Sequence, residues 1–160
     1  HINKELLEKI KSYINNYINI EKIKLTSTIE NLLNDDIYKL EYKEEYYYIP
    51  LWHNELVYEM SNNTLIIECE YELPESIDID EKNNIYITLN TTIKNIINNN
   101  EIVISLCNKK YIIPVKNLYI KKYQRYSIIG KGISIINTKD IYNIDKRANI
   151  YIDIWFQDIE

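Results

Sequence analysis

Apolar and polar residues alternate along most of the chain with a period of two. The clearest case is residues 64–72, where Glu68, Glu70 and Glu72 alternate with apolar side chains. This pattern is typical of a strand that has one buried face and one solvated, charged face. We therefore expect a protein built mainly from β-strands.

Residues 3–18 depart from this alternation. Leu6, Ile10 and Tyr13 follow one another at three- and four-residue spacing, and Asn3 stands where a helix N-cap would stand. The spacing predicts an amphipathic helix. Two interpretations stay open: the helix packs on its own domain, or it ends a linker or meets a partner.

One stretch of the sequence occurs twice. Residues 25–51 and 89–115 align without a gap at an offset of 64, with eight identical positions. Such agreement in one frame indicates an internal duplication. The identical pairs are Leu25/Leu89, Thr28/Thr92, Ile29/Ile93, Asn31/Asn95, Asn34/Asn98, Tyr47/Tyr111, Ile49/Ile113 and Pro50/Pro114.

Each copy predicts the same order of elements: a strand, a short helix capped by Thr or Ser, and a β-hairpin. The remaining alternating segments predict further strands, and residues 134–149 predict a loop. The expected strands are 20–26, 37–42, 46–51, 55–60, 64–72, 85–89, 101–106, 111–115 and 150–156, and the short helices are 28–33 and 92–97.

A break between the copies is expected at residues 74–82, which hold a proline and several acidic residues. A solvated connector is the preferred interpretation, because calcium loops have a denser, glycine-bearing ligand spacing. The fold class expected is mainly β, with two tandem β-sandwich-like domains, each with a short helix, after an N-terminal helix. The expected boundaries are 1–18, 19–74 and 75–160.

Composition narrows the class of function. The net charge of -5 and the pI near 5.2 argue against a nucleic-acid partner, which normally needs a basic face. No apolar run reaches the length of a membrane span and no signal pattern is present, so we expect no membrane partner and a cytoplasmic protein. Cys69 and Cys107 are expected to be buried free thiols.

The sequence contains no catalytic constellation. The histidines are His1 and His53, and no Ser or Cys lies in a nucleophile context. Gly130-Lys131-Gly132 lacks the earlier glycine and the following Ser or Thr of a phosphate-binding loop. A zinc site would need more Cys and His at close spacing. We therefore expect a binding protein rather than an enzyme, with no cofactor and no metal.

Short motifs in the second copy point to a family. They are Asn84-Ile85-Tyr86-Ile87, Thr92-Ile93, Ile112-Ile113-Pro114, Ile128-Ile129-Gly130-Lys131-Gly132-Ile133 and Arg147-Ala148-Asn149-Ile150-Tyr151-Ile152. In this order, the region from about residue 20 to 156 resembles the C-terminal substrate-binding region of DnaJ-type co-chaperones (J-domain proteins). Ala148 and Asn149 stand where the family has Gly and Asp.

Several parts of that family are missing from the sequence. There is no His-Pro-Asp motif of a J domain, and residues 43–45 close the first hairpin where relatives carry a cysteine-rich zinc module. The resemblance is therefore to the zinc-free subgroup, without the J domain. The family's C-terminal dimerisation helix is also not found, so we expect a monomer or a weak dimer.

The resemblance implies that the first copy binds unfolded client polypeptides by strand addition and apolar pockets, for delivery to a DnaK-type chaperone. The matching positions are Ile23, Leu25, Tyr38, Leu40 and Tyr42. Each of these is open to a second interpretation as ordinary core. Relatives that bind the acidic tail of their chaperone partner carry Lys where this chain has Tyr38.

The second copy is expected to serve as a scaffold. A rival function is that of a structural or assembly β-protein that binds one fixed protein partner. A hydrolase with converging carboxylates in an acidic cleft is the remaining alternative.

Overall fold

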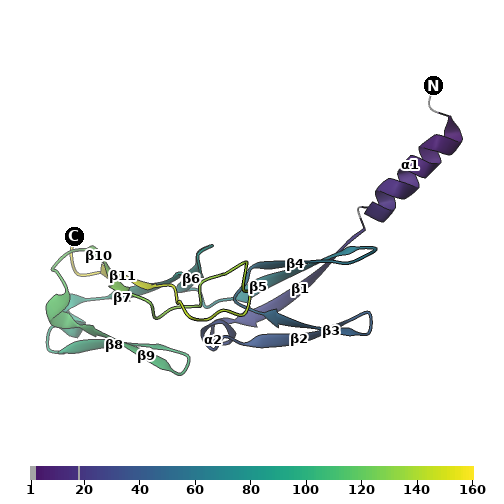
Figure 1. Cartoon of the computed structure of the whole chain (residues 1–160). Helices are drawn as coiled ribbons and strands as arrows, with labels where there is room; N and C mark the ends of the chain where they lie inside the picture. Colours follow the sequence, from purple (N-terminus) through teal and green to yellow (C-terminus); the bar gives the residue numbers. More distant parts are fainter. Residues whose placement is uncertain (1–2, 18) are drawn as a thin grey trace. The chain divides into compact units, whose positions relative to one another are not determined.

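The computed structural model describes residues 3–17 and 19–160. It confirms the predicted fold class, because several small β-sheets dominate and the helices are few and mostly short (Figure 1). The elements are α1 (Lys4–Tyr17), β1 (Ile20–Thr28), α2 (Ile29–Leu33), β2 (Ile37–Tyr42), β3 (Glu45–Pro50), β4 (Glu55–Glu59), β5 (Thr64–Glu72), β6 (Ile77–Ile79), β7 (Ile85–Thr91), α3 (Ile93–Ile96), β8 (Glu101–Leu106), β9 (Lys109–Pro114), the 3-10 helix η1 (Val115–Asn117), β10 (Tyr123–Ile128) and β11 (Ile150–Phe156).

The chain forms two compact units that interleave along the sequence. Unit 1 comprises His1–Thr26 and His53–Glu70, and unit 2 comprises Ser27–Trp52 and Tyr71–Glu160. The first hairpin therefore belongs to the same unit as the whole second copy. The domain boundaries expected from the sequence stay a prediction.

The duplicated stretch folds as the same series of elements in both copies. The strand, short helix and hairpin of the first copy recur 64 residues later, with β2 matching β8 and β3 matching β9. Both short helices start one residue later than expected, and their caps are Thr28 and Thr92, which the sequence had placed inside the helices. Thr28 Oγ1 accepts from Asn31 N at 3.3 Å, and Thr92 Oγ1 accepts from Asn95 N at 3.1 Å. A cap of this kind satisfies an amide that the first helical turn leaves without a partner.

The strand order also repeats. One sheet has the order β1-β5-β4, and the other has the order β10-β11-β7-β6, so β5 and β11 occupy equivalent central positions. Strand β11 pairs with β7 in parallel and with β10 in antiparallel register. The inward side chains of the second sheet are almost fully buried; they include Ile85, Ile150, Ile152, Ile154 and Phe156.

The expected connector at residues 74–82 is more ordered than predicted. It contains the short strand β6, which pairs with β7 and buries Ile77. Asp80 then accepts hydrogen bonds from Lys82 N, from the main chain and side chain of Asn84, and from the Tyr86 hydroxyl at 2.9 Å. The acidic run therefore includes a structural turn rather than only a solvated linker.

Two other expectations have mixed outcomes. Cys69 is a buried free thiol as predicted, and burial raises its pKa to about 11. Cys107 is free but exposed, so its predicted burial is wrong; it lies in the turn of the second hairpin with φ at 56°.

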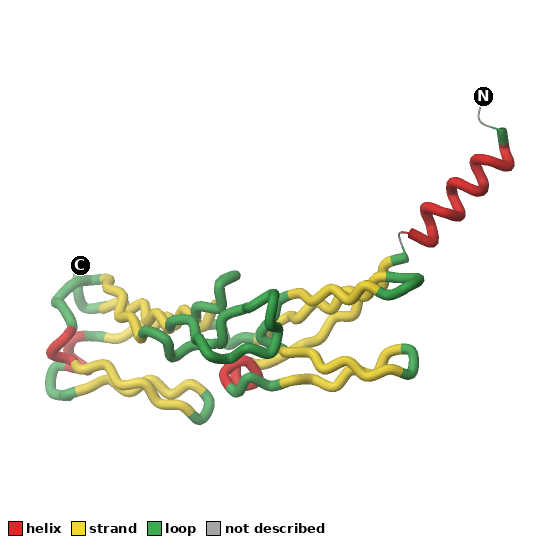
Figure 2. Tube along the Cα trace, in the orientation of Figure 1, coloured by secondary structure: helices red, strands yellow, loops and turns green. Residues whose placement is uncertain are grey.

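The long loop predicted at residues 134–149 is confirmed, apart from a single bridge between Ser134 and Arg147 (Figure 2).

Helix α1 begins where the sequence predicted. Asn3 Oδ1 accepts a hydrogen bond from Leu6 N at 2.7 Å, which caps the first turn. Leu6, Leu7 and Ile10 are 40–48% exposed. These side chains are largely exposed in the described structure, and both interpretations of the helix stay predictions. Ile18, the expected last residue, lies outside the described residues.

The turn of the first hairpin is built from unfavourable residues. Lys43 and Glu44 both have positive φ, at 48° and 65°. Two-residue turns with two positive φ angles favour Asn-Gly, because other side chains clash with the backbone there. We expect the double substitution Lys43→Asn with Glu44→Gly to raise the free energy of unfolding by about 1 kcal/mol in urea titrations.

The control for this substitution is Glu45→Gly. Glu45 begins β3, where added backbone freedom should lower stability rather than raise it. A turn variant that is no more stable than the wild type, or a Glu45→Gly variant that is stabilised as much as the turn variant, would contradict the strain in the turn.

The Asp80 turn predicts a pH-dependent stability. Burial acts to raise the pKa of the Asp80 carboxyl, but the hydrogen bonds from Asn84, Tyr86 and Lys82 outweigh it and hold the pKa below its ordinary value. Because the folded pKa is the lower one, this stabilisation is present at neutral pH and is lost as the pH falls below about 4.

We expect Asp80→Asn to lower the free energy of unfolding at neutral pH and to flatten its decline between about pH 4 and pH 2. Asp78→Asn removes the same charge from an exposed position and should leave that decline near the wild-type course. Denaturant titrations across this pH range measure both, and an unchanged decline in Asp80→Asn would show that the turn does not contribute.

Candidate functional site

The first hairpin presents two different faces. Leu40 on β2 and Ile49 on β3 point to one face and are 9% and 0% exposed. Ile37, Tyr46 and Tyr48 lie on the other face and are 49–54% exposed. The hairpin thus contributes to the core through one side and displays a largely apolar, aromatic surface on the other.

One edge of this hairpin carries main-chain groups that point outward. Leu51 N donates to Asp36 O at 3.2 Å, and bonded pairs alternate with non-bonded pairs along an antiparallel ladder. The amides and carbonyls of Ile37, Lys39 and Glu41 therefore face away from β3. Within the described part of the chain β2 has a single strand neighbour, β3, so this edge is open.

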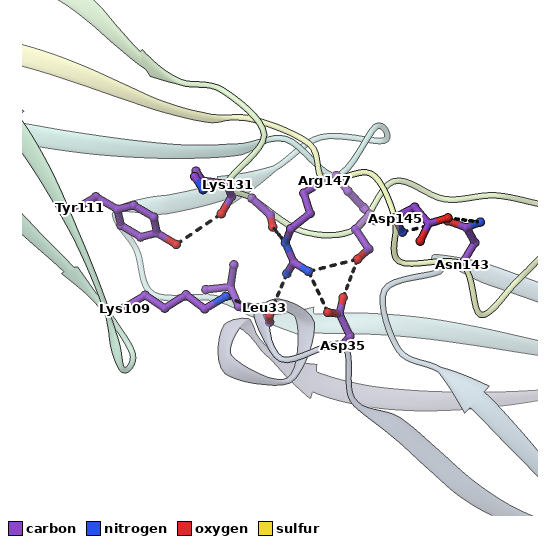
Figure 3. A network of polar contacts seen from close by, with 11 residues as sticks. Leu33, Asp35, Lys109, Tyr111, Lys131, Asn143, Asp145 and Arg147 are labelled. Atoms are coloured by element: carbon purple, nitrogen blue, oxygen red, sulfur yellow. Dashed lines mark hydrogen bonds and ion pairs between the residues drawn. The ribbon is translucent and has the colours of Figure 1, made fainter.

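Arg147 fixes the base of the hairpin from the loop before β11 (Figure 3). Its guanidinium donates to Leu33 O at 2.8 Å, to Asp35 Oδ2 at 2.8 Å and to Gly132 O at 2.7 Å. Ser134 Oγ donates to the other Asp35 oxygen at 2.6 Å. Since Arg147 and Asp35 are 22% and 17% exposed at their side chains, this half-buried network resists solvent competition.

Two more contacts hold the hairpin in unit 2. Lys109 Nζ donates to Leu33 O at 3.3 Å, next to the Arg147 contact in Figure 3. The Tyr142 hydroxyl donates to Tyr48 O at 2.8 Å, on the outer edge of β3. The long loop therefore covers part of the β3 edge, whereas no hydrogen bond of this kind is described at the β2 edge.

The five residues expected to bind substrate divide between the two units. Tyr38, Leu40 and Tyr42 lie on one face of β2 in unit 2, and they are exposed, buried and half-buried respectively. Ile23 and Leu25 are half-buried on β1 in unit 1. Leu40 has a clear role in the core, and a groove formed by all five residues stays a prediction.

The hairpin surface combines positive charge with aromatic rings. Lys39 Nζ lies 4.1 Å from the centroid of the Tyr46 ring, within the range of a cation–π contact. The Tyr47 hydroxyl donates to Glu45 at 3.2 Å, and desolvation together with this bond raises the pKa of Tyr47. Such a surface can contact polypeptide through aromatic rings and main-chain groups.

Sequence reasoning did not identify the Arg147 network. The sequence holds only two arginines among 19 basic residues, Arg125 and Arg147. Both bind carboxylates, since Arg125 contacts Asp153 through two nitrogens at 2.8 and 3.2 Å. Arginine forms fixed, multidentate contacts that lysine cannot reproduce. The rarity of arginine in this lysine-rich chain was therefore the sequence feature that could have indicated a structural role for Arg147.

Comparison with protein-family models finds no match for this chain, and a search of curated proteins finds none either.

Across residues 3–17 and 19–160, no three His, Cys, Asp or Glu side chains are placed to hold a metal ion. No helix in the same described ranges combines the length and apolar character needed to cross a membrane.

The network predicts a large effect of Arg147→Met. Loss of the guanidinium leaves the half-buried Asp35 Oδ2 without its charged donor and leaves the Leu33 carbonyl with only the 3.3 Å contact from Lys109, which should cost about 2–3 kcal/mol of unfolding free energy. Urea titration measures this cost.

The matched control is Arg125→Met. Arg125 also pairs with an aspartate, but its side chain is 43% exposed, so we expect a loss of less than about 1 kcal/mol. Similar losses in the two variants would contradict a special role for the Arg147 network.

Proposed function

We propose that the chain is the polypeptide-binding module of a DnaJ-type co-chaperone, which holds unfolded clients by strand addition for delivery to a DnaK-type chaperone. The observation that carries this proposal is the open β2 edge, with the outward main-chain groups of Ile37, Lys39 and Glu41. Main-chain hydrogen bonds at such an edge bind any extended segment, independent of its sequence.

Side chains around this edge suit an apolar client. Tyr38 is 48% exposed on one face of β2, and Ile37 is 49% exposed on the other. A paired strand places successive side chains on alternate faces, so it would contact both. The Lys39–Tyr46 pair adds a positive charge that is already positioned beside the edge.

The fixed base of the hairpin also supports binding. The Arg147 network and the Tyr142 hydroxyl restrain the hairpin at α2 and β3 without using the β2 edge. A restrained edge loses less conformational entropy when a peptide pairs with it. The module would thus present a strand that is already held in the conformation needed for pairing.

A proline substitution tests the edge without disturbing the hairpin. The Lys39 amide points outward, so Lys39→Pro removes one donor from the edge and none from the β2–β3 ladder. We expect this variant to suppress the aggregation of a guanidinium-denatured enzyme about fivefold less well than the wild type, measured by light scattering.

The control is Val103→Pro, at the equivalent position of the second copy 64 residues later. The Val103 amide also points outward, from β8, so this variant likewise removes one edge donor and no ladder hydrogen bond. Under the proposal this variant keeps wild-type activity, because the first copy binds clients and the second is a scaffold. Full activity of Lys39→Pro, with its fold verified by circular dichroism, would refute the assignment of the β2 edge.

The same assay separates the rival function. A structural or assembly protein with one fixed partner would not protect several unrelated denatured clients. Protection of none of them by the wild-type chain would therefore overturn the co-chaperone proposal itself.

A further inference from the structure

A hollow of about 420 Å³ lies beside the second hairpin, within unit 2. Strands β9 and β10 both line it, through Tyr111 and Ile112 on one side and Tyr126, Ser127 and Ile128 on the other. Its volume falls within the range of ordinary ligand sites. The lining is largely apolar and aromatic, which suits a peptide side chain.

The β9 edge at this hollow is open. Val115 N donates to Asn100 O at 3.0 Å, which sets the alternation of bonded pairs along β8 and β9. The main-chain groups of Lys110 and Ile112 therefore point away from β8. Since β8 and β9 form a two-stranded sheet, no strand among the described residues pairs with these groups.

The β10 edge has the same property. Phe156 N donates to Lys122 O at 2.8 Å, so the groups of Gln124 and Tyr126 face β11 while those of Arg125 and Ser127 face outward. Strand β10 stands at the end of its sheet in the described structure. The hollow is thus lined by two strands that each have a free edge.

The β3 edge of the first copy, which is equivalent to the β9 edge, is partly occupied by a hydrogen bond. Tyr48 corresponds to Ile112 at the offset of 64, and its outward carbonyl accepts a hydrogen bond from the Tyr142 hydroxyl. No hydrogen bond to the Ile112 main chain from the long loop is described. The two copies therefore differ at this edge, although their hairpins have the same register.

The charge around the hollow is positive. Lys110 and Lys131 are exposed among its lining residues, and none of the lining residues is acidic. This contrasts with the net charge of -5 of the whole chain. Lysine on an edge strand also discourages unwanted pairing, and that role alone would give no preference for a ligand.

We propose that the hollow between β9 and β10 binds an extended peptide segment in which acidic side chains alternate with apolar ones. The segment pairs with the outward groups of Lys110 and Ile112, of Ser127, or of both strands. Its apolar side chains enter the hollow beside Tyr111 and Ile128, and its carboxylates lie near Lys110 and Lys131. This site is separate from the β2 edge and does not depend on the client-binding function.

Fluorescence anisotropy with labelled ten-residue peptides tests the proposal on the whole chain. The probe alternates Glu with Val, a second peptide carries Lys in place of Glu, and a third is the acidic probe with every second amide N-methylated. We expect saturable binding of the acidic probe that weakens with added salt. The other two peptides should bind about tenfold more weakly.

Two proline variants locate the site. Ile112→Pro removes an outward donor from β9, and Val103→Pro removes the equivalent donor from the opposite edge of the same hairpin. We expect the first to weaken binding of the acidic probe about fivefold and the second to leave it within about twofold of wild type. Both hairpins should stay folded by circular dichroism, because neither substitution removes a ladder hydrogen bond.

A charge-reversed variant tests the preference for acidic segments. Lys110→Glu with Lys131→Glu should lose affinity for the acidic probe and gain affinity for the lysine peptide. If reversal leaves the order of affinities unchanged, the lysines serve only to discourage edge pairing and the proposal fails.

Other outcomes would also overturn it. Absence of saturable binding to the wild-type chain would do so, as would binding that survives Ile112→Pro but is lost in Lys39→Pro, which would place the peptide at the β2 edge. A wild-type dimer that Ile112→Pro dissociates in sedimentation would show that a second copy occupies the edge. Protection of denatured clients is a separate measurement that reports on the β2 edge, so the client-binding proposal can hold when this one fails.

Discussion

The contact between Arg147 and the turn at Leu33–Asp35 is the interaction on which the proposed binding surface depends. One guanidinium joins the end of α2, the turn before β2 and the main chain at Gly132. These groups come from the first copy and from the region that follows the second copy, yet they lie in one compact unit. The base of the first hairpin is therefore held by Arg147, more than a hundred positions away in sequence, and this contact leaves the β2 edge free.

Duplication explains both the similarity of the two copies and their difference. The same caps and hairpin registers recur because the local signals recur, with Thr at the N-cap and Pro at the end of the second hairpin strand. The long loop between β10 and β11 follows only the second copy, and through Tyr142 it covers an edge of the first. One insertion thus leaves different edges open in two otherwise equivalent hairpins.

Local structure could be predicted from the sequence because local residues determine it. The alternation in β5 and the capping residues of α2 each lie within ten positions of the groups that they serve. The partner of Asp35 lies 112 residues away, and no local pattern reports it. Likewise, alternation places Tyr38, Leu40 and Tyr42 on one face, but only tertiary packing decides that Leu40 alone is buried. Strand β6 was missed because its three residues are too short to show a period.

Amide hydrogen exchange at β2 tests the central claim most directly. In the free chain, the outward amides of Ile37, Lys39 and Glu41 have no strand partner among the described residues and should exchange quickly. When an unfolded client is bound, these three amides should become protected while the amides of Val103 and Ser105 on β8 change little. Unchanged exchange at Ile37, Lys39 and Glu41 under saturating client would contradict strand addition at this edge.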